Sequence, residues 1–342
     1  MAMKASYFVG KGSFEVRQAP ELHPGAGEVV VRNKFCGVCG TDVHIFHGEP
    51  GSADVNPPVV LGHEYSGEIV EVGEGVTDLQ VGDHVTVDPN IYCGKCEHCR
   101  NGKKQLCESM EAIGVTRDGG FAEYSRIPAS QAFKLDPAVP YEAAAMAEPL
   151  ACCLHGIDLA GIKPGQKVCV IGGGAIGLIM VQLAKLSGAS ALVLSEPNEL
   201  RRQVGLGLGA DAAIDPTAAD AQSAYEAALG DGADVVIECV GNNPAVKSAF
   251  QLAAKGATIV LFSVPKVEAT FDLPLFDVYK KELTIKGSFV NPDTHARAVA
   301  LINSGKVRFD TIITHKFTLD QLPEAIAMQM SSESIKVIVE AK

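Results

Sequence analysis

Residues 167–177 read KVCVIGGGAIG, a short apolar strand that runs directly into closely spaced glycines. The apolar stretch after it predicts a helix, so Gly172, Gly174 and Gly177 fall at a strand-to-helix turn. Glycines at this spacing allow a tight turn and let a pyrophosphate approach the positive N-terminus of the helix. Glu196 follows the next expected strand, where a carboxylate can accept hydrogen bonds from ribose hydroxyls. The stretch therefore predicts a dinucleotide-binding fold; the alternative is a Gly-rich turn in an unrelated doubly wound domain.

The alternation of strands and helices continues on the C-terminal side of this turn. Apolar strands separated by helices form βαβ units, which give a parallel sheet with helices on both faces. The expected strands cover residues 191–195, 233–238 and 257–262, with helices from about Asn198 and Pro244.

The first 140 residues have a different texture, with short β-branched runs bounded by Gly, Pro or Asp. Such runs are typical of a β-sandwich or a partly open barrel. They cover residues 29–31, 59–61, 69–72 and 84–87.

The C-terminal tail is too small to fold alone. After Lys286 we expect only one helix, at 294–304, and a closing strand at 336–340. A length of 342 residues suggests two domains. We therefore predict one domain formed by residues 1–151 and 291–342, and a second formed by 152–290.

The composition excludes several classes of partner. The chain has a formal net charge of −12 and 47% hydrophobic residues. Because no basic surplus is present to neutralise phosphates, neither a nucleic acid nor an anionic membrane is an expected partner. The first ten residues lack a secretory signal, and the longest apolar run, 176–186, is too short to span a bilayer. We therefore expect a cytoplasmic protein whose 10 cysteines stay reduced.

Four of these cysteines have the spacing of a metal-binding loop. Four thiolates separated by two, two and seven residues can fill all four positions of one tetrahedral Zn²⁺ ion. A closed site leaves no position for a substrate, so its expected role is structural. The four residues are Cys93, Cys96, Cys99 and Cys107.

Two further segments combine thiols, imidazoles and carboxylates. Residues 36–44 read CGVCGTDVH and residues 62–67 read GHEYSG. On its own, a His–Glu pair after a strand is more often a structural hydrogen-bonding pair than a metal site. Together with the thiol loop and the glycine turn, however, these segments resemble the zinc-dependent medium-chain alcohol dehydrogenases, closest in pattern to their polyol, threonine and butanediol dehydrogenase branch. The resemblance covers essentially the whole length and implies a GroES-like β-rich catalytic domain with a Rossmann doubly wound cofactor domain.

The resemblance implies a catalytic zinc ion in the first domain. The family's cysteine ligand precedes Gly-Thr-Asp and corresponds to Cys39, so Cys36 becomes a small buried residue beside the site. His63 is the implied second ligand, and Glu64 is either a ligand or a close neighbour that exchanges on and off the metal. Glu148 occupies the place of a further protein ligand.

Three more residues are implied around this zinc. Asp42 would accept a hydrogen bond that orients the His63 ring. Thr41 and His44 match the family's proton relay. One thiolate, one imidazole and one carboxylate leave an open position at which zinc lowers the pKa of a bound alcohol.

The implied cofactors are two zinc ions per chain and NAD, and the implied substrate is a small alcohol or polyol. NAD is expected over NADP because Glu196 would repel a 2′-phosphate, although Arg201 and Arg202 are contrary evidence. The family also implies a homo-oligomer, a tetramer or a dimer. The residues expected to bind the cofactor are Gly172, Gly174, Ile176, Gly177, Glu196 and Arg201.

Three departures from the polyol pattern concern the substrate pocket. Val290 stands where that branch has an Arg that holds substrate hydroxyls, and Phe46 replaces a Tyr. Cys152 and Cys153 stand where small neutral residues are expected, one helical turn after Glu148. Either thiol could compete for the metal, or both could be buried packing residues.

The sequence thus favours a zinc- and NAD-dependent dehydrogenase of a secondary alcohol or a polyol such as sorbitol or L-iditol. The alternatives within the class are a threonine- or butanediol-type dehydrogenase and an NADP-preferring aldehyde or ketone reductase. Outside it are a non-catalytic zinc- and dinucleotide-binding sensor and a zinc-stabilised nucleic-acid binder. The acidic charge and the complete set of site residues count against both.

Overall fold

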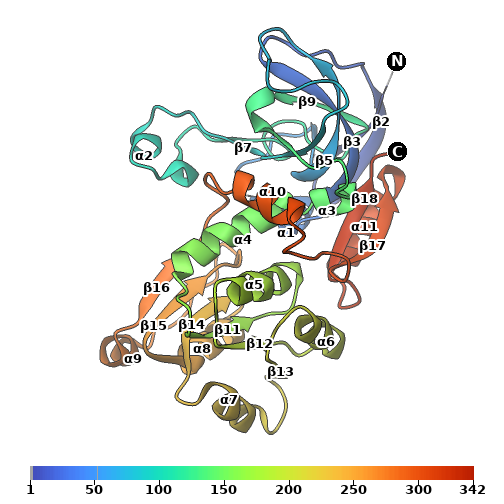
Figure 1. Cartoon of the computed structure of the whole chain (residues 1–342). Helices are drawn as coiled ribbons and strands as arrows, with labels where there is room; N and C mark the ends of the chain where they lie inside the picture. Colours follow the sequence, from blue (N-terminus) through green and yellow to red (C-terminus); the bar gives the residue numbers. More distant parts are fainter. Residues whose placement is uncertain (1–2, 52) are drawn as a thin grey trace. The chain divides into compact units, whose positions relative to one another are not determined.

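The computed structural model describes residues 3–51 and 53–342. The chain divides into two compact units, one formed by residues 1–151 and 291–342 (unit 1) and one by residues 152–290 (unit 2) (Figure 1). Within the described residues, no helix is both long and apolar enough to cross a bilayer.

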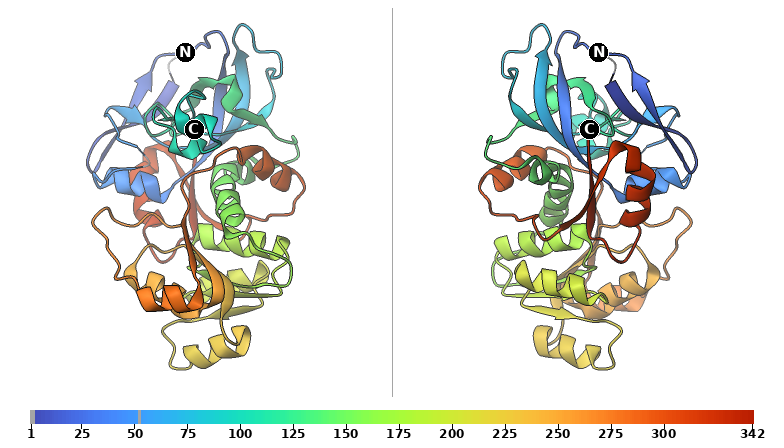
Figure 2. Two further views of the ribbon diagram at one scale, coloured as in Figure 1. Left: turned by 90° about the vertical axis from the view of Figure 1, so that its left-hand side faces the viewer. Right: turned by 90° about the vertical axis from the view of Figure 1, so that its right-hand side faces the viewer.

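Unit 2 contains a six-stranded sheet in which every neighbouring pair is parallel, in the order β13-β12-β11-β14-β15-β16. Figures 1 and 2 show α5 and α6 on one face and α7 and α8 on the other, which confirms the predicted doubly wound fold. The strands are β11 Lys167–Ile171, β12 Ala191–Ser195, β13 Ala212–Ile214, β14 Ala233–Glu238, β15 Ala253–Leu261 and β16 Thr284–Gly287; the helices are α5 Ala175–Leu186, α6 Glu199–Gly207, α7 Ala221–Leu229, α8 Asn243–Leu252 and α9 Leu275–Lys281.

The central strand β11 is buried on both faces, as a continuous apolar run requires. It leads into Gly172, whose φ of +99° lies in the region that only glycine adopts readily. A Cβ atom on Gly177 would lie 1.7 Å from the Gly172 carbonyl oxygen. Glycine at 177 therefore lets α5 begin directly against the end of β11.

Unit 1 is built mainly from antiparallel strands. Its seven-stranded sheet has the path β10-β6-β5-β3-β18-β17, with β9 also paired to β3, and a smaller sheet has the order β2-β1-β4. The strands are β1 Met3–Gly10, β2 Ser13–Ala19, β3 Glu28–Gly37, β4 Val59–Val60, β5 Glu64–Val72, β6 His84–Val87, β7 Asn90–Ile91, β8 Glu111–Ala112, β9 Tyr124–Pro128, β10 Ala132–Lys134, β17 Ile313–Thr318 and β18 Lys336–Glu340. The helices are α1 Gly40–Phe46, α2 Glu97–Arg100, α3 Tyr141–Ala144, α10 His295–Asn303, α11 Leu322–Gln329 and the start of α4, Ala147–Ala160.

The C-terminal tail contains more structure than the sequence predicted. Besides α10 and β18, it forms strand β17 and helix α11, so the expectation of a single helix and strand was wrong. Thr318 and Gln321 form a capping box before α11, and Leu322, Ala325 and Ile326 bury one face of this short helix. A helix of eight residues has too few turns for a clear apolar period, and packing stabilises it instead.

A buried polar cluster ties the returning chain to the first part of unit 1. The backbone N–H of Asn90 and the side-chain amide of Asn291 both donate to the Asp88 carboxylate, at 3.1 and 3.2 Å. Burial raises the pKa of Asp88 to about 6, even though both hydrogen bonds act to lower it. The nearby charge of Asp293 also raises this pKa.

This raised pKa predicts a pH-dependent contribution to stability. The folded protein disfavours the ionised form of Asp88. The contribution of Asp88 to the free energy of unfolding is therefore fully present below the ordinary pKa of an aspartate, and it is lost as the pH rises to about 6. We expect Asp88→Asn to raise the free energy of unfolding at pH 7.5 by about 1–2 kcal/mol, since one pKa unit corresponds to about 1.4 kcal/mol. The gain should shrink at pH 5.

Denaturant unfolding of both proteins at several pH values measures this difference and cancels pH effects common to both. Asp320→Asn, at an exposed carboxylate paired with Lys4, is the matched control and should leave the pH dependence unchanged. A variant less stable than the wild type at pH 7.5 would contradict the assignment.

Candidate metal centre and cofactor site

Three segments far apart in sequence meet at one end of the large sheet of unit 1. Strand β3 pairs with β5 so that Gly37 lies opposite Glu64, and it pairs with β18 so that Gly37 lies opposite Ile338. The chain just past β3 therefore lies beside the starts of β5 and β18. This register brings Cys39 close to His63, Glu64 and Lys336.

The sequence-predicted ligands Cys39, His63 and Glu64 form a compact cluster. The Cys39 sulfur, a ring nitrogen of His63 and a carboxylate oxygen of Glu64 all lie within 4.8 Å of one another. Both His63 and Glu64 are buried. One thiolate, one imidazole and one carboxylate form a donor set that Zn²⁺ accepts, with a fourth position left for water or substrate. The residues present therefore fit a catalytic zinc ion.

Lys336 is a member of this site that the sequence analysis missed. Its ammonium group is buried, forms an ion pair with Glu64 and donates to the Val38 carbonyl oxygen at 3.0 Å. Burial acts to lower the pKa of Lys336, but the Glu64 carboxylate and the Cys39 sulfur hold it above its ordinary value. A lysine in the otherwise apolar stretch from Ile335 to Val339 was the available signal, because a buried lysine needs an anionic partner.

The cluster holds more negative than positive charge. Cys39, Asp42 and Glu64 are three potential anions near the buried ammonium group of Lys336, and the charge of Glu148 also acts on His63. Buried charges are costly unless they are paired. A divalent cation bound by the three ligand atoms would offset this excess of negative charge.

The Asp42 carboxylate lies beside Nδ1 of the His63 ring. One Asp42 oxygen is 3.7 Å from His63 Nδ1, an ion-pair separation longer than a hydrogen bond, while the other oxygen accepts from the Cys39 backbone N–H at 2.9 Å. Burial acts to lower the pKa of His63, but Asp42 and Cys39 raise it well above its ordinary value. The Asp42 carboxylate thus stabilises positive charge on the His63 ring or on a cation bound to that ring.

Glu148, Cys153 and Cys36 all lie outside the cluster of donor atoms that Glu64 joins. Glu148 is buried and its charge acts on His63, yet its carboxylate is not among the three clustered donor atoms. Cys153 is buried and its sulfur lies 3.9 Å from the Ile176 carbonyl oxygen, inside unit 2. Cys36 is fully buried, and a Cβ atom on Gly62 would lie 2.7 Å from its sulfur. Of the two predicted carboxylate ligands, only Glu64 joins the donor cluster.

Thr41 and His44 lie three residues apart on α1, so they share one face of this helix. Both side chains are partly exposed. Phe46, which replaces the Tyr of the polyol branch, stacks on Phe14 of β2 with ring centroids 5.5 Å apart. That ring therefore contributes to packing within unit 1.

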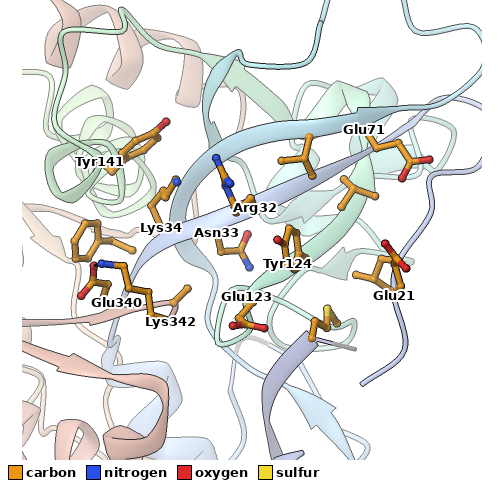
Figure 3. Close-up of a pocket in the computed structure, with 16 residues that line it drawn as sticks. Glu21, Arg32, Asn33, Lys34, Glu71, Glu123, Tyr124, Tyr141, Glu340 and Lys342 are labelled. Carbon is orange, nitrogen blue, oxygen red and sulfur yellow. Dashed lines mark ion pairs between the residues drawn. The ribbon is translucent and has the colours of Figure 1, made fainter. Parts of the chain in front are cut away.

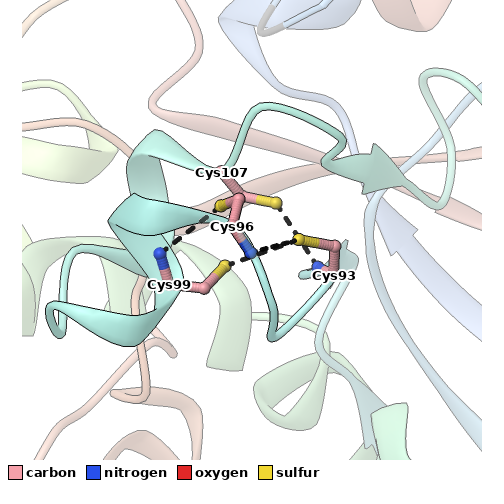
Figure 4. Close-up of side chains that lie close together, drawn as sticks. All are labelled: Cys93, Cys96, Cys99 and Cys107. Atoms are coloured by element: carbon pink, nitrogen blue, oxygen red, sulfur yellow. Dashed lines mark hydrogen bonds between the residues drawn. The ribbon is translucent and has the colours of Figure 1, made fainter.

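The four remaining predicted ligands gather on one loop, with their sulfurs within 4.8 Å of one another (Figure 4). The Cys96 N–H donates to the Cys93 sulfur at 3.3 Å, and the Cys99 N–H donates to the Cys96 sulfur at 3.5 Å. Backbone N–H groups lower the pKa of Cys93 to about 6, whereas burial raises the pKa of Cys99 to about 12. All four thiolates coexist only with a cation among them, so the loop fits a structural zinc ion.

The glycine turn of unit 2 leaves the start of α5 accessible. Gly174, the N-cap of α5, provides no side-chain cap, and a Cβ atom there would meet nothing within 4 Å. The Glu196 carboxylate accepts from the N–H groups of Gly173, at 2.6 Å, and Asn198, at 2.8 Å. The Glu196 carboxylate is therefore held beside the start of α5, whose backbone N–H groups are suited to a pyrophosphate.

The two arginines after Glu196 differ in their surroundings. Arg202 donates to the carbonyl oxygens of Glu196 and Pro197 and pairs with Glu199. Arg201 lies closer to the glycine turn, because a Cβ atom on Gly173 would lie 3.2 Å from its Cβ. Arg202 is therefore engaged by its own loop.

A separate cavity of about 870 Å³ lies on unit 1 (Figure 3). Its lining includes Arg32, Lys34 and Lys342, and none of the predicted metal ligands or relay residues. These three cations pair with Glu68 or Glu340. The predicted chemistry therefore lies outside this cavity.

Comparison with known proteins gives matches on both units. A family model described as "Alcohol dehydrogenase GroES-like domain" matches residues 25–137, and one described as "Zinc-binding dehydrogenase" matches residues 175–304. Together they cover most of the chain.

Individual relatives match over nearly the whole length. A sorbitol dehydrogenase from Halalkalibacterium halodurans is 38% identical over 337 residues, covering 96% of both chains. An L-threonine 3-dehydrogenase from Bacillus licheniformis is 34% identical over 331 residues, covering 96% of this chain and 94% of the other. A solved structure described as a zinc-binding dehydrogenase from Sinorhizobium meliloti 1021 bound to NADP has a TM-score of 0.94 and 41% identity, covering 99% of both chains.

Proposed function

Since the chain belongs to the zinc-dependent medium-chain alcohol dehydrogenase family, it is an alcohol or polyol dehydrogenase, and we propose that it transfers a hydride from a secondary alcohol or polyol to NAD. The observation that carries the proposal is the cluster of Cys39, His63 and Glu64 donor atoms within 4.8 Å. An open metal position beside these three donors is what an alcohol oxygen requires.

Two metal sites and one cofactor site follow from this proposal. Cys39, His63 and Glu64 would hold the catalytic zinc, and the loop of residues 93–107 the structural one. The turn from Gly172 to Gly177 would hold the cofactor pyrophosphate. When bound, zinc polarises the alcohol oxygen and NAD accepts the hydride. Two zinc ions per chain and a cytoplasmic location stay predictions.

The chain's own residues have three tasks in this reaction. Lys336 holds the Glu64 carboxylate by an ion pair, and Asp42, 3.7 Å from Nδ1 of His63, would orient the His63 ring. Thr41 and His44, on one face of α1, would take the proton that the alcohol loses. We also propose that the carboxylate of Glu64 or Glu148 binds the catalytic zinc and leaves it reversibly.

The substrate is proposed as a class. The sorbitol and threonine dehydrogenase relatives support a small hydroxylated substrate. An initial-rate screen at 340 nm over polyols, sugar acids, threonine and simple secondary alcohols, with NAD and NADP, tests the proposal. Cofactor binding without turnover on any substrate would instead favour the non-catalytic sensor.

The preference for NAD is supported by the surroundings of Glu196. Its carboxylate is buried and held by two N–H groups, so it cannot turn away from an approaching 2′-phosphate without losing both bonds. Like charges in a partly desolvated crevice repel strongly. Arg202, which could have neutralised a phosphate, is engaged by carbonyl oxygens and carboxylates. The relative bound to NADP is the opposing observation.

We expect Glu196→Ser to lower the ratio of kcat/KM for NAD to kcat/KM for NADP by about tenfold. This change corresponds to about 1.4 kcal/mol of discrimination between the two cofactors. The ratio should fall because kcat/KM for NADP rises once the repelling charge of Glu196 is removed. Glu196→Gln, which keeps the shape and an acceptor oxygen, is the matched control for loop geometry and should shift the ratio in the same direction. An unchanged ratio in both variants would show that Glu196 does not face the ribose.

A homo-oligomer is proposed from the surface of unit 2. Around α9, several large apolar side chains are exposed, and β16 ends its sheet with no partner among the described strands on its outer side. Exposed apolar patches and open strand edges are features of subunit interfaces. The apolar residues are Val264, Val267, Leu275, Phe276 and Tyr279.

We expect the wild type to sediment as a dimer or tetramer and Phe276→Asp/Tyr279→Asp to sediment as a smaller species, since charges at an apolar interface oppose association. Val81→Asp, at an exposed valine of unit 1, is the matched control. A wild-type monomer would contradict the proposal, and so would unchanged assembly of the double variant.

A further inference from the structure

His44 is paired with a carboxylate that the relay described above does not use. Its Nδ1 atom lies 2.5 Å from a carboxylate oxygen of Glu49. The Glu49 backbone N–H also donates to the His44 carbonyl oxygen, at 2.9 Å. Two separate contacts thus join the two residues.

The turn that brings Glu49 back over His44 is fixed by its surroundings. Gly48, two residues past the end of α1, has a φ of +77°, which reverses the chain. The Phe46 carbonyl oxygen accepts from Gly12 at 2.7 Å, and the Phe46 ring stacks on Phe14. The hairpin of β1 and β2 therefore holds the C-terminal end of α1, so the pair is more constrained than an ordinary surface ion pair.

A carboxylate opposite Nδ1 decides which ring nitrogen carries the proton. An ionised carboxylate can only accept, so Nδ1 donates and Nε2 of the neutral ring is left as an acceptor. A relay histidine must accept a proton and then release one. The exposed fractions of the two side chains, 27% for His44 and 43% for Glu49, place the carboxylate on the solvent side.

We propose that Glu49 is a positioning residue for His44 that fixes Nε2 as the proton acceptor and passes the Nδ1 proton to water. The inference rests on the proposed function. In alcohol oxidation NAD would take the hydride when bound, and Thr41 would pass the hydroxyl proton toward Nε2 of His44. The protonated ring would then pass its Nδ1 proton to Glu49 and on to water. Return of a proton from water to Nδ1, with loss of the Nε2 proton, would restore the starting tautomer, so that one proton leaves net for each alcohol oxidised.

Few other ionisable groups lie on the elements around His44. Asp42 and His47 are on or beside α1, Lys11 packs its stem against Gly48, and Glu324 is on α11, which packs against α1. Asp42 is fully buried and held by the Cys39 N–H. Among the described residues, the carboxylate that contacts the His44 ring is that of Glu49.

The first test measures the ring tautomer without any turnover. Protein labelled with ¹⁵N-histidine is studied by NMR at alkaline pH, and the His44 signals are assigned by their loss in His44→Gln. We expect protonated Nδ1 in the wild type and a shift toward protonated Nε2 in Glu49→Ala. The same tautomer in both proteins would overturn the proposal.

The second test measures rates with the best alcohol from the screen. We expect Glu49→Ala and Glu49→Gln to lower kcat at pH 7 about tenfold with KM changed less than twofold. Added formate should restore part of the rate of Glu49→Ala. In the His44→Gln background, Glu49→Ala should cost nothing further, because the two residues act in series.

Glu15→Ala, at an exposed carboxylate paired with Arg17, is the matched control and should keep the wild-type rate. An unchanged kcat in both Glu49 variants, or a full additional loss in the His44→Gln background, would overturn the role of Glu49. Absence of turnover in the wild type would refute the proposed function instead, and the tautomer measurement would still decide whether Glu49 positions His44.

Discussion

Replacing His63 or Cys39 by alanine should abolish alcohol oxidation, to below about one thousandth of the wild-type kcat/KM, while unit 1 should stay folded. Each substitution removes one donor from the cluster that would bind the catalytic zinc. Removal of residues that only support metal ligands already costs about 10- to 100-fold, so loss of a direct ligand costs more. The metal content should fall from about two to about one zinc ion per chain, because one open site is lost and the closed site is untouched.

The structure indicates why the fold should survive these changes. The Asp42 carboxylate caps α1 by accepting from the backbone N–H of residue 39, a bond that Cys39→Ala retains. The ion pair of Lys336 and Glu64 also remains in both variants. Circular dichroism and metal analysis of the purified variants check both points.

Cys36→Ala is the matched control, since Cys36 is a buried neighbour outside the donor cluster. We expect it to keep two zinc ions and most of the activity. Substantial turnover in His63→Ala or Cys39→Ala would defeat the assignment of the catalytic site, and so would loss of zinc in Cys36→Ala.

Cys96→Ser or Cys99→Ser should lower the melting temperature by about 10 °C and disturb assembly more than chemistry. A closed four-thiolate site contributes its binding free energy to folding, and a loss of about 3 kcal/mol shifts the midpoint of a domain of this size by several degrees or more. The loop from Cys93 to Cys107 contains only the short α2 helix and one 3₁₀ turn, so little else stabilises it.

His98→Ala lies in the same short helix and leaves all four sulfurs in place, which makes it the matched control. We expect its melting temperature and metal content to stay near those of the wild type. Inactive Cys96 and Cys99 variants with unchanged melting temperatures would show that the metal in this loop is catalytic.

Local sequence patterns determined most of unit 2. The bounds of β11, β12 and β14 agree with the predicted strands, because each is an apolar run between a turn and a helix. Strand β15 begins four residues before the predicted start, at Ala253, directly after α8. The short elements β13, α7, α9 and β16 carry weaker periodicity and were not predicted.

In unit 1, the metal-ligand candidates followed from sequence and resemblance, but the balance of charge around them did not. The ion pair of Lys336 and Glu64 joins residues 272 positions apart, and it exists because β18 and β5 both pair with β3. The distinction between Glu64, inside the donor cluster, and Glu148, outside it, likewise needed coordinates.

By itself the sequence determined the thiol loop, the glycine turn and the acidic residue after β12, because each depends on residues close together along the chain. Only the tertiary structure decided which buried cation meets Glu64, which carboxylate faces His44 and how Asp88 comes to be buried beside Asn291. The physical reason is that a short spacing fixes a local conformation, whereas the partner of a buried charge depends on strand register and chain reversal. A single sequence records the need for such a partner without recording where the fold supplies it.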